Sequence, residues 1–177
     1  MRIIAGQWRG RRLESVPGRT TRPTADRVRE AWLSALQFEV SGSRVLDLFA
    51  GSGALGLEAL SRGAAHATFV ESAPRALRTL HANIERLEAG AATTVVRQDA
   101  IAYAKRLDLA AFDIALADPP YGRGFAASLA RLFLERPFAR MLWVEHGAGE
   151  SLPAAPSART RRYGDTALTS IPAPDND

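Results

Sequence analysis

The chain has 177 residues, a length typical of one domain with a core of two or three layers. It has a formal net charge of +4 and no cysteine, which excludes disulfides and cysteine-ligated zinc. No run of about 18 apolar residues is present, and the first apolar run is too short for a signal peptide, so we expect a cytoplasmic protein outside the membrane. The histidines lack metal-ligand spacing, and we expect no metal site; they are His66, His81 and His146.

Basic charge is concentrated at the start of the chain. Residues 1–29 hold eight arginines and two acidic residues, a net charge of +6 that leaves −2 for the rest. Because Lys105 is the only lysine, an arginine-rich composition on a solvated face is one explanation. The uneven distribution favours a polyanion partner, since clustered guanidinium groups pair with phosphates. The candidate contacts are Arg9, Arg11, Arg12, Arg22 and Arg27.

The first predicted elements form a basic arm over residues 1–22. Residues 2–5 and 12–16 are expected to be short strands on either side of a turn, which predicts a β-hairpin. Trp8 lies in the turn between arginines, where it either stacks on a base or covers a small apolar cluster.

A helix is predicted next, with Thr24 as its N-cap and apolar residues at helical spacing up to Leu36.

A strand, a glycine loop and a helix are predicted over residues 44–63. Gly51, Gly53 and Gly56 form G-x-G-x-x-G after an apolar run, and Glu71 ends the following apolar run, 20 positions beyond Gly51. Such a loop brings backbone N–H groups at the helix start towards an anionic or polar ligand, and the acidic residue accepts hydrogen bonds from ribose hydroxyls. The alternative is a βα turn whose glycines serve only compactness.

Strands and helices then alternate, which predicts an α/β domain with a mainly parallel sheet and helices on both faces. Pro74 is expected to open the second crossover helix. Further strands are predicted at 66–71, 93–97, 112–117 and 140–145, a helix at 125–135, a final hairpin at 159–163 and 166–171, and a frayed tail at 172–177.

The stretch Asp118-Pro119-Pro120-Tyr121 follows the strand at 112–117, at the sheet edge where ligands bind in open α/β folds. The prolines fix the backbone and donate no hydrogen bonds, so neighbouring carbonyls and the Asp118 carboxylate become rigid acceptors. An exocyclic –NH2 group supplies the matching donors, and Tyr121 offers a ring on which a base can stack. The alternative is a proline turn in which Tyr121 only packs.

Together these motifs resemble class I S-adenosylmethionine (AdoMet) methyltransferases of the amino-methylating kind, which implies a Rossmann-like fold. The resemblance implies that Asp47 and the glycine loop hold the methionine part, that Glu71 takes the ribose and Asp99 the adenine, and that residues 118–121 hold the target amine. The implied cofactor residues are Asp47, Phe49, Ala50, Gly51, Ser52, Gly53, Gly56, Glu71, Asp99 and Ala100, and the implied catalytic residues are Asp118, Pro119, Pro120 and Tyr121.

The N-terminal residues extend the resemblance from methyltransferases in general to one particular family. Residues 2–13, Arg22-Pro23-Thr24 with residues 26–30, and residues 162–166 are similar to the RsmD family of bacteria. This resemblance implies a seven-stranded sheet, a catalytic core over residues 23–171, and methylation of guanine N2 in 16S ribosomal RNA. It also implies naked rRNA or an assembling 30S subunit as partner, and we expect a monomer. The Ala- and Pro-rich tail departs from the pattern, and it leaves open how complete the last strands are.

Other functions share parts of this pattern. Adenine N6 and protein glutamine also present an –NH2 group, although the basic arm disfavours a protein target. A nicotinamide-dependent oxidoreductase would use the same glycine loop, but it needs a substrate domain for which the chain has no room. A vestigial enzyme that only binds RNA during ribosome assembly is the non-enzymatic alternative.

Overall fold

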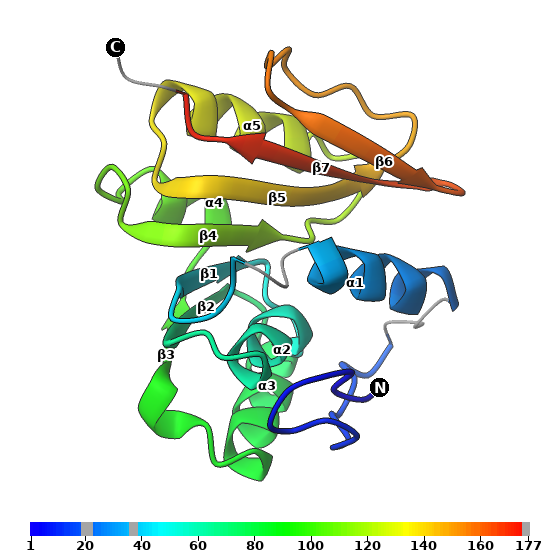
Figure 1. The fold of residues 1–177 in the computed structure, drawn as a ribbon, viewed down its shortest axis with the longest axis vertical. Coiled ribbons are helices and arrows are strands. Elements are labelled where there is room, and N and C mark those ends of the chain that lie inside the picture. Colours follow the sequence, from blue (N-terminus) through cyan, green and yellow to red (C-terminus); the bar gives the residue numbers. More distant parts are fainter. Residues whose placement is uncertain (19–22, 36–38, 175–177) are drawn as a thin grey trace.

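The computed structural model describes residues 1–18, 23–35 and 39–174, with side chains described for residues 28–34 of the middle segment. Its centre is a seven-stranded sheet in the order β3-β2-β1-β4-β5-β7-β6 (Figure 1). Strands β1 to β5 are parallel, and β7 runs antiparallel between β5 and β6. The predicted sheet is therefore confirmed. Its strands are β1 (Arg44–Leu48), β2 (His66–Glu71), β3 (Thr93–Arg97), β4 (Phe112–Ala117), β5 (Ala139–Gly147), β6 (Arg159–Tyr163) and β7 (Thr166–Pro172).

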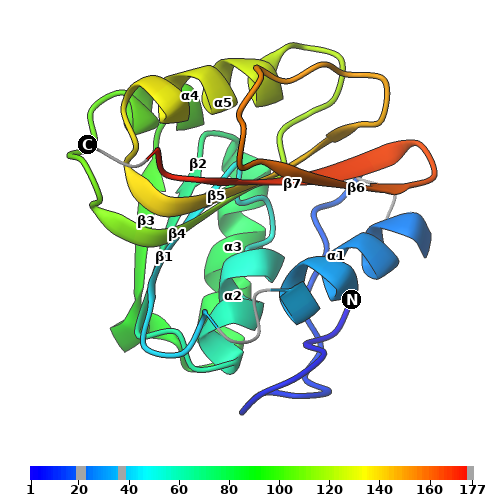
Figure 2. The same cartoon turned by 45° about the horizontal axis from the view of Figure 1, so that its top comes forward.

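Helices cover both faces of the sheet. Figure 2 shows α1 (Pro23–Ala35), α2 (Ala54–Ser61) and α3 (Pro74–Arg86) on one face, and α4 (Ala100–Ala104) and α5 (Phe125–Glu135) on the other. A short 3-10 helix, η1 (Gly90–Ala92), precedes β3. The sequence analysis did not predict α4, because a helix of five residues shows too little periodicity.

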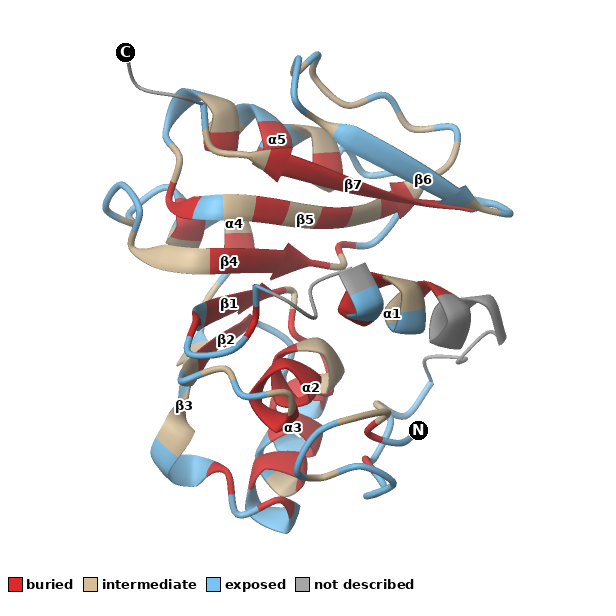
Figure 3. Cartoon of the chain, in the orientation of Figure 1, coloured by how far each residue is buried: buried red, intermediate tan, exposed pale blue. Residues whose placement is uncertain are grey.

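The core lies on both sides of the central strands. Leu46 and Leu48 of β1 and Ala115 of β4 pack under α4 and α5, whereas Val45 and Leu116 pack towards α1. Such continuous apolar runs are typical of parallel strands that are covered on both faces. Figure 3 shows the contrast between these buried strands and the exposed edge strand β6.

The N-terminal arm turns back on itself as predicted, but the two predicted strands do not form. Only one isolated bridge pairs Arg2 with Arg12, supported by a bond from the Ile3 N–H to the Arg11 carbonyl. The ladder stops because the next two N–H groups, of Ile4 and Ala5, donate to the Glu58 carboxylate on α2 instead. The arm is therefore docked on a helix rather than extended as a free hairpin.

Helix α1 begins at Pro23, so the prediction that Thr24 is its N-cap was wrong. Proline suits the first turn of a helix, because its fixed φ is helical and its missing N–H would have no partner there. At the other end of the chain, β6 and β7 are both complete, and β7 extends one residue beyond its predicted end. The Ala- and Pro-rich residues thus lie mainly in the connection before β6, and they do not shorten the last two strands.

Candidate active site

The loop predicted to bind the cofactor, residues 49–56 and called the cofactor loop, follows β1 and turns the chain into α2. Phe49, Gly51 and Gly53 have φ values of 58°, 57° and 80°, a left-handed conformation that costs a non-glycine residue about 1–2 kcal/mol. Phe49 accepts this conformation with its ring packed against Phe125 of α5, at a centroid distance of 5.6 Å. The turn brings the start of α2 to the carboxyl edge of the sheet.

Two carboxylates from neighbouring strands hold the cofactor loop. The N–H of Gly56 donates to Asp47 Oδ2 and the N–H of Gly51 donates to Glu71 Oε2, each at 2.9 Å. The N–H of Gly53 donates to the Ala50 carbonyl at 2.8 Å. The three motif glycines therefore give their N–H groups to the protein, whereas we had expected backbone N–H groups at this turn to face a ligand.

The glycines are also required for packing. A Cβ atom on Gly56 would lie 2.4 Å from Cε1 of Phe69, and one on Gly53 would lie 2.3 Å from Cδ1 of the buried Leu80. Real Cβ contacts are longer than 3.0 Å, so a side chain at either position would force Leu80, Phe69 or α2 itself to shift. Packing of the βα turn is thus one reason for glycine at positions 53 and 56, whatever ligand the loop binds.

Negative charge gathers at the ends of three strands. Asp47 of β1 is 1% exposed, and its burial raises the pKa of the carboxyl well above its usual value. The charges of Asp118 and Glu71 raise this pKa further, while the hydrogen bond from Gly56 lowers it. Carboxylates that destabilise one another in this way favour a cation between them.

The carboxylates of Glu71 and Asp99 both accept hydrogen bonds from backbone N–H groups, and both can accept further ones. Glu71 accepts from the N–H groups of Gly51, Ser72 and Ala73, which uses three of about four lone-pair positions of a carboxylate. Asp99 is exposed and caps α4, because its Oδ1 accepts from the Ala102 N–H at 2.8 Å. Each side chain keeps an oxygen that can bind a hydroxyl or amino group.

The loop that begins with the predicted amine-binding stretch, residues 118–124 and called the substrate loop, follows β4 at the same edge. Pro119 is buried, and Tyr121 is one of the two large apolar or aromatic side chains that stand exposed among the described residues, with 39% of its surface accessible. The Tyr121 hydroxyl donates to Glu145 Oε1 of β5 and lies 3.1 Å from Thr166 Oγ1 of β7. Burial and the bond to Glu145 raise the pKa of Tyr121, so its hydroxyl remains a donor at neutral pH.

Glu150 holds the other side of the substrate loop. Its Oε1 accepts from the N–H of Gly122 at 2.7 Å and from that of Gly147 at 3.3 Å. The sequence analysis missed Glu150, Glu145 and Thr166. Glu145 was detectable as the last polar residue of the predicted strand at 140–145. Glu150 reaches the loop from the turn after β5, which pairs with β4, and Thr166 becomes a neighbour through the pairing of β7 with β5.

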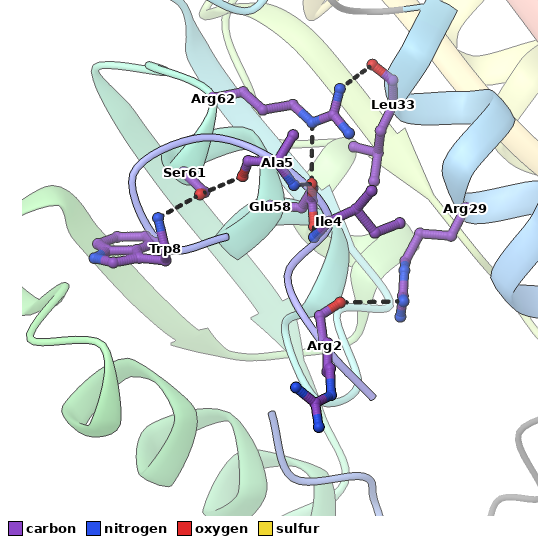
Figure 4. Close-up of polar contacts among 9 residues, drawn as sticks. All are labelled: Arg2, Ile4, Ala5, Trp8, Arg29, Leu33, Glu58, Ser61 and Arg62. Atoms are coloured by element: carbon purple, nitrogen blue, oxygen red, sulfur yellow. Dashed lines mark hydrogen bonds and ion pairs between the residues drawn. The ribbon is translucent and has the colours of Figure 1, made fainter. Parts of the chain in front are cut away.

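The arm is anchored on α2 through buried polar groups (Figure 4). Glu58, which is 1% exposed, accepts from Ile4 and Ala5 and forms an ion pair of 3.0 Å with Arg62. The Ser61 hydroxyl donates to the Ala5 carbonyl and accepts from the Trp8 N–H. Trp8 itself packs against the apolar cluster of α2 and α3, which favours a covering role for its ring over stacking on a base.

The arginines predicted to contact phosphates differ in their surroundings. Arg9 and Arg12 are exposed, and Arg11 donates to the backbone carbonyl of Arg86 on α3. The prediction for Arg22 and for the Arg27 side chain lies outside the described residues. Beside the arm, a surface hollow of about 680 Å³ separates it from α1; it is lined by Met1, Arg2, Ile4, Arg12, Leu13, Arg29 and Glu30.

The strand order, the glycine loop after β1 and the Asp-Pro-Pro-Tyr stretch after β4 define a class I methyltransferase. Residues 1–170 match the family model described as Conserved hypothetical protein 95. The chain belongs to this family, the RsmD family, as the sequence analysis predicted.

Relatives and solved structures agree with this assignment. The chain is 38% identical to ribosomal RNA small subunit methyltransferase D of Escherichia coli (strain K12) over 160 residues, 89% of this chain and 80% of the relative. It is 44% identical to the putative rRNA methyltransferase YlbH of Bacillus subtilis over 125 residues, 68% and 67% of the two chains. The solved structure of the putative methyltransferase yhhF from Escherichia coli superposes with a TM-score of 0.83 at 38% identity, covering 98% of this chain and 99% of that one.

Within residues 1–18, 23–35 and 39–174, no helix combines the length and the apolar character that a membrane crossing needs.

Proposed function

We propose that the chain transfers a methyl group from AdoMet to the exocyclic N2 amine of a guanine in small-subunit ribosomal RNA. One observation carries the proposal. The Asp118–Tyr121 stretch and the cofactor loop follow the neighbouring parallel strands β4 and β1, which places an amine acceptor beside a cofactor cradle. Membership of a family whose relatives are called rRNA methyltransferases supports RNA as the substrate.

The residues at the cofactor loop fit AdoMet. The cofactor, when bound, supplies a methyl group on a positively charged sulfur. The carboxylates of Glu71 and Asp118, whose charges raise the pKa of Asp47, give this edge of the sheet the matching negative charge. Glu71 and Asp99 keep an acceptor oxygen each, for ribose hydroxyls and for the adenine amino group. The residues that we propose to hold the cofactor are Asp47, Phe49, Ala50, Gly51, Ser52, Gly53, Gly56, Glu71, Asp99 and Ala100.

The substrate loop orients the target amine. Asp118 and a carbonyl near Pro119 accept the two N2 hydrogens, and Pro120 keeps the backbone fixed, so that the nitrogen lone pair points towards the methyl group. Positioning of this kind contributes up to about 7–11 kcal/mol in favourable intramolecular reactions. Tyr121 supports the base by stacking, worth about 1–3 kcal/mol per base.

RNA binding completes the proposal. A guanine must leave its stack to reach Tyr121, at a cost of a few kcal/mol, and arginine contacts to flanking phosphates offset that cost. We propose Arg9, Arg11, Arg12, Arg22 and Arg27 for these contacts. A substrate in the assembling 30S subunit or its rRNA implies action in the cytoplasm, and we expect the enzyme to act as a monomer.

The proposal is tested by incubating the protein with AdoMet carrying a labelled methyl group and with small ribosomal subunits that lack the modification, or with their naked RNA. Nucleoside mass analysis should then find labelled N2-methylguanosine. Labelled N6-methyladenosine would reject guanine as the target. If AdoMet binds but neither substrate is labelled, the protein is a vestigial enzyme or acts on another amine.

A further inference from the structure

The edge strand β6 carries a second concentration of arginine that the charge count over the sequence does not reveal. Arg159, Arg161 and Arg162 are all exposed, and none of them takes part in an ion pair with another described residue. The nearest acidic residue in sequence is Asp165, in the turn to β7. Because acidic residues outnumber basic ones in the chain after residue 29, this local excess is hidden in the average.

Strand register divides these arginines between the two faces of the sheet. Arg161 lies opposite Leu168 of β7, and Leu168 lies opposite Glu145 of β5. Directly opposite residues of antiparallel strands share a face, so Arg161 is on the face of Glu145, the residue that binds Tyr121. Leu168 packs with Trp32 of α1, which identifies this as the α1 face. Arg162, one residue on, belongs to the other face.

Three alternate residues of β6 form a continuous strip on the α1 face, and we call Arg159, Arg161 and Tyr163 the β6 strip. It spans about 13 Å, at roughly 3.3 Å per residue of a strand. Its last member, Tyr163, pairs with Thr166, whose hydroxyl lies 3.1 Å from that of Tyr121. Two guanidinium groups and an aromatic ring thus lead directly to the substrate loop.

The position of the strip complements that of the arm. Figures 1 and 2 both place α1 between the N-terminal arm and the hairpin of β6 and β7. Arg29 of α1 contacts the arm through the Arg2 carbonyl, and Leu168 of β7 contacts α1 from the other side. A nucleotide at Tyr121 therefore has basic surfaces in two directions.

We propose that the β6 strip is a second RNA-contact surface, which binds the phosphates on the side of the target nucleotide away from the arm. This inference rests on the proposed function. Arginine and aromatic residues along one groove are the combination that binds single-stranded nucleic acid, because guanidinium groups pair with phosphates and rings stack with bases. The simpler explanation is that charge on an edge strand prevents sheet-to-sheet aggregation. Arginines on either face of β6 would prevent aggregation equally well. RNA contact, in contrast, requires the arginines on the α1 face, so substitutions on the two faces distinguish the explanations.

The decisive comparison is between Arg161→Ala and Arg162→Ala, which remove the same charge from adjacent positions on opposite faces. The measurement is the affinity for a small-subunit rRNA transcript as a function of salt. We expect Arg161→Ala to lower the affinity for RNA about fivefold at 0.1 M salt. The double variant with Arg159→Ala and Arg161→Ala should make the slope of log K against log salt shallower by about 1.4. Arg162→Ala should lose less than about twofold, the effect of one distant, screened charge.

A second control removes two charges from the opposite layer, with Arg131→Ala and Arg136→Ala at α5. Calorimetric binding of AdoMet and the thermal midpoint check that each variant is folded. Equal losses of RNA affinity for Arg161→Ala and Arg162→Ala would overturn the proposal that the β6 strip binds RNA. An unchanged salt slope for the double β6 variant would also overturn it. If instead the wild-type protein does not methylate rRNA at all, the proposed function fails, and the two failures are thereby distinguished.

Discussion

The cofactor loop and the substrate loop lie side by side, and each is held by two carboxylates that accept hydrogen bonds from the loop. The difference lies in the packing beneath them. In the cofactor loop, residues 50–53 are buried, and a Cβ on Gly53 would collide with Leu80. In the substrate loop, residues 120–124 are exposed, and a Cβ on Gly122 or Gly124 would meet open space.

This comparison shows two ways of giving a loop a fixed shape. The cofactor loop is part of the core, so its shape follows from folding and should change only when the fold is damaged. The substrate loop takes its shape from side-chain contacts to Glu145, Glu150 and Thr166, so it should respond to substitutions that leave stability nearly intact.

The largest effect is expected from Asp118→Ala. It removes the proposed acceptor for the target amine, and the rate of methyl transfer should fall by about 10²- to 10³-fold, as for the loss of one preorganised hydrogen-bonding group in other enzymes. Labelled-methyl transfer to rRNA is the measurement. The control is Asp113→Ala at the opposite end of the same strand, which removes the same charge. An unchanged rate for Asp118→Ala would refute the catalytic assignment.

The difference in packing is tested by Gly53→Ala and Gly124→Ala. Both glycines are N-caps, of α2 and α5, and both are left-handed, with φ values of 80° and 71°. Each substitution carries the backbone cost of about 1–2 kcal/mol, but only Gly53→Ala also overpacks the core, which typically costs about 1–3 kcal/mol more. Urea unfolding should show that difference in the free energy of unfolding. Equal destabilisation of the two variants would contradict the comparison.

The tether of the substrate loop is tested by Tyr121→Phe and Glu145→Gln. Tyr121→Phe removes the hydroxyl that contacts Glu145 and Thr166, and Glu145→Gln weakens the bond to Glu145. We expect about a tenfold loss of methyl-transfer rate for each, equivalent to about 1.4 kcal/mol. The double variant should lose little more than either single variant, because both act on the same contact. Tyr103→Phe, in the opposite layer, is the control and should keep the wild-type rate. Fully additive losses would show that Glu145 does not act through Tyr121.

The smallest effects concern the pH dependence of stability, with opposite signs in two regions. Burial raises the pKa of Asp47 above its usual 3.8, so the unfolded chain releases this proton first and stability falls as pH rises above that value. Burial lowers the pKa of His146, a β5 residue that contacts Thr169 of β7, below its usual 6.5, so stability is lost as pH falls below that value. Urea unfolding between pH 4.5 and 7.5 should show that Asp47→Asn removes the first slope and His146→Gln the second. A variant with the wild-type slope would contradict its assignment.

Local and periodic signals were sufficient to predict most of the fold and the position of the two loops. The apolar runs, the glycine spacing and the two prolines after β4 each act over a few residues. The parts that could not be predicted depend on contacts between distant segments. Glu58 looks like a solvated residue of α2 until the arm covers it. Thr166 reaches Tyr121 because β7 pairs with β5, and Glu150 reaches Gly122 because β5 pairs with β4. Whether the proposed residues bind cofactor and RNA stays a prediction.

The insertion of β7 between β5 and β6 has a consequence for protein synthesis. Strands β1 to β4 and the cofactor loop are complete in sequence once Ala117 has left the ribosome, but a domain generally folds as one unit. Tyr121 receives its Thr166 partner only when β7 emerges about fifty residues later. The substrate loop therefore cannot take its final shape until nearly the whole chain has been made, so synthesis of the C-terminal hairpin should be the last step before the chain can hold an RNA base.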